Sequence, residues 1–381
     1  MCFGRSLHGF LGVNLVYTRE IKLWFCKSGT IWGMLSKLKL NNFRSYEMKE
    51  WDFVDGVNLV FGPNAFGKTN LLEAIFLLGV GESFRAKRIE EMVRFGEELG
   101  RVSGEELDED GDVLALEVVV SGGVVMGKKV NKRKYIIDGA SKRKRDIIGL
   151  LPLVLFRPED VELISGAPDE RRRFLDKVLL SVDKTYDHSL STYEQALKRR
   201  NKLLDAIREG AATRYSLTFW DGLMIKHGAV IQEKRREFVE YINSLFSRSE
   251  LFNKLNLTYD ASAISEARLE QYREAETALG YTLVGPHKDD LIIKEINRDL
   301  SVYGSRGEQR MAVLACKMGE IYFLEERTKK RAVLLLDDIF SELDGEHKQE
   351  VLRVMAGRQV IVTTADEGDI PMFKNAKLIR L

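Results

Sequence analysis

Eight residues carry the strongest chemical signal in this 381-residue chain, because their types and spacing fit the pattern G-x-x-x-x-G-K-[ST]. Glycines let backbone N–H groups close on phosphate oxygens, Lys68 supplies a positive charge to the β- and γ-phosphates, and Thr69 offers a hydroxyl to Mg²⁺. A strand-like run precedes this turn and a helical pattern follows it. We therefore expect ATP and Mg²⁺ to bind at Gly62, Pro63, Asn64, Ala65, Phe66, Gly67, Lys68, Thr69 and Asn70.

Two carboxylates follow the apolar run Val333–Leu336, which is typical of a strand buried on both faces of a parallel sheet. Asp337 and Asp338 are the first positions that such a strand exposes to a ligand crevice. We expect Asp337 to hold Mg²⁺ through water, and Asp338 to orient or deprotonate an attacking water. Lys68 completes the catalytic candidates. Alone, the two acids would fit a solvated strand end equally well. Together with the phosphate-binding motif at Gly62–Thr69, which we call the phosphate loop, they favour a nucleotide site.

The segment Ser305–Arg310 precedes a third apolar pattern, of helical period. The spacing from Ser305 to Glu308 predicts a capping box. A glycine-containing helix N-terminus with a serine hydroxyl is also suited to bind a phosphate. Ser305, Gly307 and Gln309 therefore join the nucleotide-binding candidates.

The elements around these motifs alternate between β-rich and helical character. Asp110-Gly111 and Asp138-Gly139 are hairpin-turn dipeptides, and the apolar run Ile147–Phe156 indicates a buried strand. Pro168 suits the first position of a helix, and helical periodicity continues to about Phe246. We expect an α/β fold in which a helical insertion interrupts a β-rich unit. The predicted parts are an N-terminal extension (1–33), a nucleotide-binding lobe in two segments (34–157 and 283–381) and a helical lobe (158–282).

Composition excludes several classes of protein. Lys and Arg number 59 against 58 Asp and Glu, a net charge of +1, so DNA binding must rest on local clusters. The three cysteines form no CxxC pair and the five histidines show no zinc spacing, which argues against a disulfide scaffold or a zinc module. No run reaches the roughly 18 apolar residues that cross a bilayer. We expect a cytoplasmic protein without a membrane partner, preceded by a leader without a signal-peptide cleavage site.

One local cluster fits DNA. Residues 128–145 hold nine cations against one acid, Asp138, on what is interpreted as a hairpin. Such a hairpin would give salt-sensitive, sequence-independent binding, although a solvated face has the same pattern. The candidates are Lys128, Lys129, Lys132, Arg133, Lys142, Arg143, Lys144 and Arg145. Arg171–Arg173 fit intramolecular ion pairs equally well, Asp289-Asp290 are interpreted as surface carboxylates, and His287 as structural.

The three nucleotide motifs, in this order, resemble the ATP-binding-cassette heads of SMC-like DNA repair ATPases, in particular the RecF family of bacterial DNA replication and repair proteins. The resemblance spans nearly everything from Met34 to Leu381. Its further stretches are Leu40–Arg44, Phe156–Asp160, Arg171–Asp176, Tyr193–Asn201, Gly285–Asp290, Tyr303–Arg310 and Leu336–Asp344.

The resemblance implies an ABC-type head with a mixed-sheet lobe I and a helical lobe II, and a homodimer that forms with ATP. The Ser305/Gly307 helix end of one subunit would face the ATP held by Lys68 of the other. Ser341–Asp344 would cross the interface, and Thr363-Thr364 would lie near the γ-phosphate. It also implies binding to single-stranded DNA, gapped DNA or duplex junctions, recombinational repair, SOS induction, and partnership with RecR and RecO in loading RecA.

Two departures from the cassette pattern bear on catalysis. Cassette ATPases usually carry Glu where Asp338 stands; the shorter side chain is expected in the RecF family and points to slow turnover. We expect a weak, DNA-stimulated ATPase that acts as a switch, and whether the protein is an enzyme stays open. No glutamine lies between Lys68 and Gln195, so none can be assigned to sensing Mg²⁺. Two alternatives stay open: the ATPase subunit of a membrane transporter, and a DNA scaffold that binds ATP without hydrolysing it.

Overall fold

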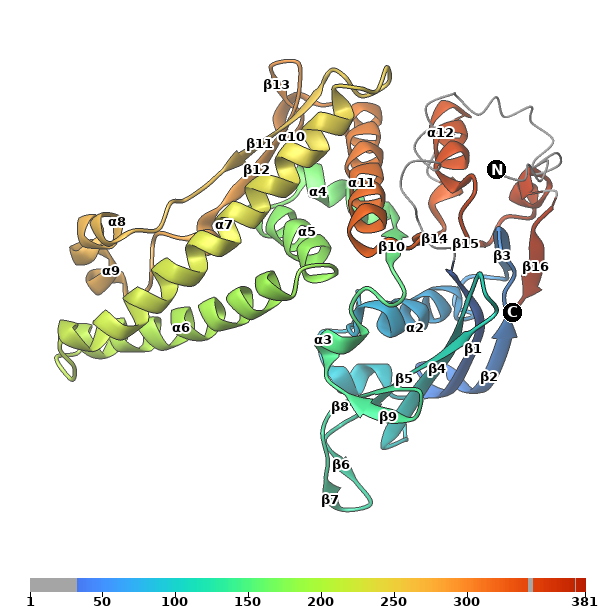
Figure 1. The fold of residues 1–381 in the computed structure, drawn as a ribbon, viewed down its shortest axis with the longest axis horizontal. Helices are drawn as coiled ribbons and strands as arrows, with labels where there is room; N and C mark the ends of the chain where they lie inside the picture. The colour runs from blue at the N-terminus through green and yellow to red at the C-terminus, as the bar shows by residue number, and fades with distance from the viewer. Residues whose placement is uncertain (1–32, 342–344, 374) are drawn as a thin grey trace. The chain divides into compact units, whose positions relative to one another are not determined.

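The computed structural model describes residues 33–341, 345–373 and 375–381 (Figure 1). They form two compact units, each considered by itself below. The first combines the described part of Met1–Glu159 with Leu324–Leu381, and the second is Asp160–Phe323. The chain therefore leaves the first unit, builds the second and returns, which confirms the predicted insertion. The predicted return at residue 283 lies inside the second unit, because the segment from there to Phe323 folds with it.

An antiparallel sheet of six strands forms one layer of the first unit, in the order β2-β1-β4-β5-β8-β9. Asp138 and Gly139 both have positive φ and form the two-residue turn between β8 and β9. Asp110-Gly111 lie between β4 and β5, so both predicted hairpin turns are confirmed. The strands are β1 (Gly33–Phe43), β2 (Tyr46–Asp52), β4 (Leu99–Asp108), β5 (Val113–Ser121), β8 (Arg133–Ile137) and β9 (Ala140–Lys142).

A parallel sheet of five strands forms the other layer, in the order β10-β14-β15-β3-β16. Only β10 and β3 precede the insertion, so the sheet is complete only after the chain returns. The strand expected over Ile147–Phe156 is shorter than predicted, because Gly149 (φ 80°) and Pro152 interrupt the apolar run. The strands are β10 (Leu153–Phe156), β14 (Val333–Asp337), β15 (Val360–Thr364), β3 (Val57–Phe61) and β16 (Lys377–Arg380).

Helix α2 (Lys68–Val80) contacts strands of both sheets and joins their apolar faces into one core (Figure 1). Ten of its thirteen residues are buried, which explains why its sequence is apolar on nearly all sides. A Cβ at Gly79 would lie 2.4 Å from the Leu153 side chain, so this close approach to β10 requires glycine. Gly81, in the left-handed conformation, ends the helix. The C-terminal end of α2 is thereby held close to β10.

Among the described residues, every helix is too short or too polar to traverse a lipid bilayer.

Shorter elements complete the first unit, and the helix α12 is the longest of them. They are η1 (Ile89–Met92), β6 (Val124–Val125), β7 (Lys128–Lys129), α3 (Lys144–Ile147), η5 (Ile339–Ser341), α12 (Gly345–Met355) and η6 (Glu367–Phe373), and η2 (Pro158–Val161) leads out of the unit.

The second unit is mainly helical, with one small antiparallel sheet, β11-β12-β13. Pro168 opens α5 as predicted, and the Asp183 carboxylate caps α6 by accepting from the N–H groups of Thr185 and Tyr186. Its elements are α4 (Glu162–Ser165), α5 (Pro168–Leu180), α6 (Lys184–Arg208), η3 (Arg214–Leu217), α7 (Thr218–Phe246), β11 (Leu255–Asp260), α8 (Glu266–Gln271), α9 (Arg273–Leu279), η4 (Pro286–Lys288), β12 (Asp290–Glu295), β13 (Arg298–Asp299), α10 (Leu300–Tyr303) and α11 (Arg306–Thr328) as far as Phe323.

A buried polar network holds this unit together. The Arg235 guanidinium, 2% exposed, donates to Asp176 on α5 (2.7 Å) and to Asp289 before β12 (2.9 Å). Asp289 also accepts from Gln232 (2.9 Å) and from the Tyr259 hydroxyl. The interpretation of Asp289 as a surface carboxylate is therefore wrong, because its oxygens are saturated inside the protein. Among the described residues, acidic, histidine and cysteine side chains form no cluster suited to a metal ion.

His287 is structural, as expected. Its Nε2–H donates to the Thr282 carbonyl (3.1 Å), so Nδ1 is free to accept from the Tyr193 hydroxyl (2.8 Å). This arrangement uses the neutral ring. Burial, reinforced by nearby cations, lowers the pKa of His287 from 6.5 to about 4.

This pKa predicts how stability depends on pH. Between about pH 6.5 and 4, His287 is protonated in the unfolded chain but neutral in the folded protein. The contribution of His287 to the free energy of unfolding is therefore complete above pH 6.5 and is lost as the pH falls towards 4. We expect the wild type to lose about 2 kcal/mol more unfolding free energy between pH 7 and pH 5 than His287→Gln does. Urea unfolding at both pH values measures the difference, and equal losses in the two proteins would contradict it.

Candidate nucleotide site

The predicted phosphate loop, Gly62–Thr69, leaves β3 at the carboxyl end of the parallel sheet and enters α2 at Lys68. Two loop residues have positive φ, Ala65 (69°) and Gly67 (100°). A Cβ at Gly67 would lie 2.6 Å from the Tyr46 hydroxyl, which itself donates to the Gly67 carbonyl (3.1 Å). Glycine is therefore required here by both conformation and space. Pro63, Asn64, Ala65 and Phe66 are exposed, whereas Gly62, Gly67 and Lys68 are buried.

Lys68 is folded back over the loop. Its ammonium donates to the carbonyls of Gly62 (2.6 Å) and Pro63 (3.1 Å) and, more weakly, to Asn64 Oδ1 (3.4 Å). Burial lowers the pKa of Lys68, while the negative charges of Asp338 and Asp337 oppose this shift. The loop thus holds a cation inside the ring of backbone groups that would surround a phosphate.

Asp337 ends β14, and its carboxylate is hydrogen-bonded to helix α2 and to the neighbouring strand β15. Its Oδ1 accepts from the hydroxyl of Thr69, in the first turn of α2 (3.1 Å), and from the hydroxyl of Thr363 on β15 (3.0 Å). Burial raises the pKa of Asp337, and the two hydroxyl bonds oppose that rise. The structure therefore brings together the two residues predicted to hold a metal ion, although they lie 268 positions apart.

Asp338 follows in the left-handed conformation (φ 51°), which aspartate tolerates better than most side chains. Its N–H donates to the Thr363 hydroxyl (3.0 Å), and the Ser341 hydroxyl donates to its carbonyl (2.7 Å). Burial raises the pKa of the Asp338 carboxyl, opposed by Lys68. Thr364, the other threonine expected near the γ-phosphate, donates to Asp369 (2.8 Å). Of the segment 341–344, residues 342–344 lie outside the described residues.

A Mg²⁺ ion fits the donor set at this edge. Thr69 supplies a hydroxyl and Asp337 a carboxylate, both hard oxygen ligands. Two protein oxygens are few, which is the usual arrangement where substrate phosphates and waters complete the octahedron.

A second polar cluster, which the sequence interpretation missed, lies beside the loop. Arg44, at the turn between β1 and β2 (φ 53°), donates to both oxygens of the buried Glu73 on α2 (2.8 and 2.6 Å). Ser83 donates to the same carboxylate (2.5 Å). An isolated acid within an apolar helix was the available signal, because a buried carboxylate requires a partner.

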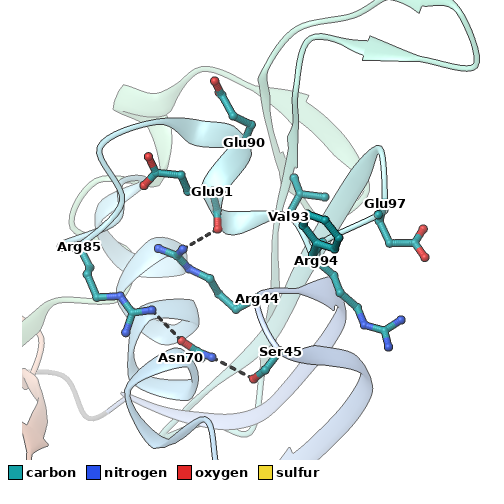
Figure 2. Close-up of a pocket in the computed structure, with 11 residues that line it drawn as sticks. Arg44, Ser45, Asn70, Arg85, Glu90, Glu91, Val93, Arg94 and Glu97 are labelled. Carbon is teal, nitrogen blue, oxygen red and sulfur yellow. Dashed lines mark hydrogen bonds between the residues drawn. The ribbon is translucent and has the colours of Figure 1, made fainter. Parts of the chain in front are cut away.

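Arg44 also lines a cavity of about 540 Å³. Figure 2 shows Arg44 donating to the Glu91 carbonyl, and Asn70 between Ser45 and Arg85. Asn70, predicted to contact nucleotide, therefore already bridges the β1–β2 turn and the segment after α2. The cavity joins the first turn of α2 to η1.

The Ser305 motif lies in the second unit, at the start of α11. The capping box is confirmed: Ser305 N–H donates to Glu308 (2.7 Å), and Glu308 N–H donates to the Ser305 hydroxyl (3.3 Å). Hydrogen bonds from Arg298 and Ser305 lower the pKa of Glu308 to about 2. The Gln309 amide donates to the Leu300 carbonyl (2.9 Å) and so fixes the segment that leads from α10 into α11. Gly307 is half-buried.

The predicted DNA-binding residues do not lie on one hairpin, because the chain turns twice between residues 126 and 139. Four of the eight form ion pairs: Lys132 with Glu90 (3.3 Å), Lys144 (2.6 Å) and Arg133 (3.8 Å) with Glu82, and Arg145 with Asp146 (4.0 Å). The other four candidates are exposed and form no ion pair with a described residue: Lys128, Lys129, Lys142 and Arg143.

Arg171, Arg172 and Arg173 each form an ion pair within the second unit. Their partners are Asp290, Asp169 and Glu170. The ion-pair interpretation of these arginines is confirmed.

Comparison with known proteins supplies the family. Residues 34–379 match the family described as RecF/RecN/SMC N terminal domain. The DNA replication and repair protein RecF of Lachnoclostridium phytofermentans is 35% identical over 344 residues, covering 87% of this chain and 92% of that protein. RecF of Roseiflexus castenholzii is 36% identical, covering 91% and 98%. The chain belongs to the RecF family.

Solved structures agree with this membership. The recombination mediator protein RecF, as RecF-ATPrS in the RecFOR pathway, has a TM-score of 0.82 at 32% identity, covering 92% of this chain and 96% of that chain. An Smc head domain from Pyrococcus furiosus shares the fold, with a TM-score of 0.50 at 19% identity, covering 91% and 93%. The predicted ABC-type ATPase head with an inserted helical lobe is thus confirmed.

The Arg44–Glu73 pair generates a stability prediction. In Arg44→Lys the charge remains, but a lysine cannot donate to both oxygens of the buried carboxylate. We expect a loss of about 2 kcal/mol, measured by chemical unfolding. Arg85→Lys is the matched control, because the Arg85 side chain is exposed and makes one hydrogen bond to the described residues, to Asn70 (3.2 Å); its change should stay within about 0.5 kcal/mol. Equal stabilities of the two variants would contradict the role given to the Arg44 fork.

Proposed function

We propose that this protein is an ATP-dependent DNA-binding switch of replication and recombinational repair. The observation that carries the proposal is the hydrogen bond between Thr69 and Asp337 (3.1 Å), with Lys68 and Asp338 beside it. It joins the phosphate loop to the acidic strand end as a nucleotide–metal site requires. The family membership supports repair and replication as the setting, and relatives solved with ATP support ATP as the ligand.

The roles of the residues follow from their geometry. The loop N–H groups and the start of α2 would surround the phosphates, and Lys68 would turn from the loop carbonyls to the β- and γ-phosphates. Mg²⁺ held by Thr69 and Asp337 would neutralise part of the phosphate charge. Asp338 would take the proton of the attacking water, and its raised pKa favours that role. Its side chain is one carbon shorter than glutamate, which fits slow turnover.

We further propose that a second copy completes the site. The Ser305 hydroxyl accepts a bond within the capping box, so its proton remains available to a phosphate. Gly307 has no side chain to block a close approach, and the 23-residue α11 directs the positive end of its dipole to the same place. Gln309 is the weakest candidate, because its amide already donates to Leu300.

DNA, single-stranded, gapped or at a duplex junction, is the proposed macromolecular ligand, with RecR, RecO and RecA as partners and the cytoplasm as the location. Family membership decides against the transporter subunit. The scaffold that binds ATP without hydrolysing it is the remaining competitor, and Asp338 is the residue that separates it from a switch.

Asp338→Asn should trap the closed state. The amide cannot accept the proton of water, so ATP hydrolysis should fall about 10²–10⁴-fold while binding persists. Sedimentation with ATP and a short gapped duplex should show a dimer that outlasts the wild-type dimer. Lys68→Ala is the control and should stay monomeric. If the wild type and Asp338→Asn dissociate at the same rate, the protein is a scaffold.

Neutralising Lys142–Arg145 should weaken DNA binding. Lys144 already pairs with Glu82 and Arg145 lies near Asp146, so we expect the slope of log K against log salt to fall by about 2 rather than 4. Fluorescence anisotropy across a salt series measures this slope. An unchanged slope would assign the DNA contact to another surface.

A further inference from the structure

A short β-ribbon extends from the six-stranded sheet of the first unit. The strands β5 and β8 continue past their last ladder pair into β6 and β7, which form a separate two-stranded sheet. Figure 1 shows this ribbon projecting from the edge of the unit, without a neighbouring strand. Bonds from Ser121 N–H to the Lys132 carbonyl and from Val130 N–H to the Gly123 carbonyl (both 3.0 Å) link it to the sheet.

The ribbon is well specified despite its isolation. Met126 (φ 49°) and Gly127 (φ 72°) form a two-residue turn with both residues at positive φ, the type whose twist matches a hairpin. Glu98 accepts from the Met126 N–H (2.7 Å), and Glu90 pairs with Lys132 at the base (3.3 Å). These contacts hold the ribbon in one orientation.

The apolar side chains at its end are largely exposed. Met126 is 88% exposed at the tip, and Val124 is 55% exposed behind it. Lys128 pairs with Val125 and Lys129 with Val124, so the two lysines point to opposite faces of the ribbon. Among the described residues neither lysine forms an ion pair, so the ribbon presents an apolar tip, beside the Glu98 carboxylate, with an unpaired cation on each face.

We propose that this ribbon enters the major groove of duplex DNA. A two-stranded ribbon with its side chains is about 10 Å thick, which fits the major groove, about 12 Å wide, and exceeds the minor groove, about 6 Å wide. The three residues from Val130 to the tip reach about 10 Å, close to the groove depth of about 8.5 Å.

In this position the two lysines meet the phosphates of the two strands that border the groove. Met126 meets the base edges, where the thymine methyl group is the apolar partner. This arrangement of two lysines and an apolar tip favours DNA over an acidic protein as the ligand. The lysines lie on opposite faces of the ribbon, and the two phosphate backbones lie on opposite sides of the major groove. The proposal rests on the proposed DNA-binding function and adds the element and the groove.

The test uses the full-length protein with a 30-base-pair duplex and the corresponding single strand. Lys128→Gln/Lys129→Gln should lower the slope of log K against log salt by about 2 on duplex, with at least a fivefold weaker Kd at 150 mM salt. Lys39→Gln/Lys49→Gln removes the same charge from exposed lysines of β1 and β2 and should change neither quantity.

Met126→Asn isolates the tip. Asn-Gly is a favoured sequence for this turn, so the ribbon stays folded while its apolar end is lost. We expect about threefold weaker duplex binding at an unchanged salt slope, because the contact removed is uncharged. Methyl green, which occupies the major groove, should compete with the wild type, and netropsin, which occupies the minor groove, should not.

The outcomes separate the two proposals. If the wild type binds neither DNA, the proposed function fails. If it binds duplex and the Lys128/Lys129 variant matches the control, or if netropsin alone competes, the ribbon proposal fails while DNA binding stands.

Discussion

The hydrogen bonds that converge on Asp337 are the constraint on which the proposed nucleotide site depends. One oxygen of this half-buried carboxylate accepts from Thr69 and from Thr363, and so ties the first turn of α2 to the ends of β14 and β15. A charge that is partly removed from water needs such donors, so the three elements hold one another in register. The same contacts leave one carboxylate beside a hydroxyl at the sheet edge, which is the donor pair that Mg²⁺ prefers.

The insertion has a direct consequence for this geometry. The parallel sheet receives β14, β15 and β16 only after the chain returns from the second unit, and β14 then lies between β10 and β15. The acidic strand end therefore meets the phosphate loop only in the complete first unit. Helix α2 packs against both sheets and begins at Lys68. The position of the phosphate loop therefore also depends on both sheets being complete.

Local sequence patterns were sufficient to predict much of the fold and of the candidate site. The phosphate loop, the acidic strand end, the Ser305 capping box and the turn at Asp138-Gly139 are each encoded within a few residues, where glycine, a buried strand or a cap leaves a clear signal. The Arg44–Glu73 pair and the burial of Asp289 join residues far apart in sequence, so local patterns could not supply their partners. The basic stretch was misplaced on one hairpin because Met126-Gly127 is an unusual turn sequence, whereas Asp138-Gly139 is a favoured one.

The central claim is that two copies each supply half of a nucleotide site, and mixing two inactive variants tests it most directly. Lys68→Ala and Ser305→Arg should each lack ATP hydrolysis alone. A heterodimer of the two contains one pocket with both residues intact, so an equal mixture should recover hydrolysis that neither variant shows alone, at up to about half of the wild-type rate, because each heterodimer carries one working pocket of two. A mixture as inactive as its components would contradict the shared site.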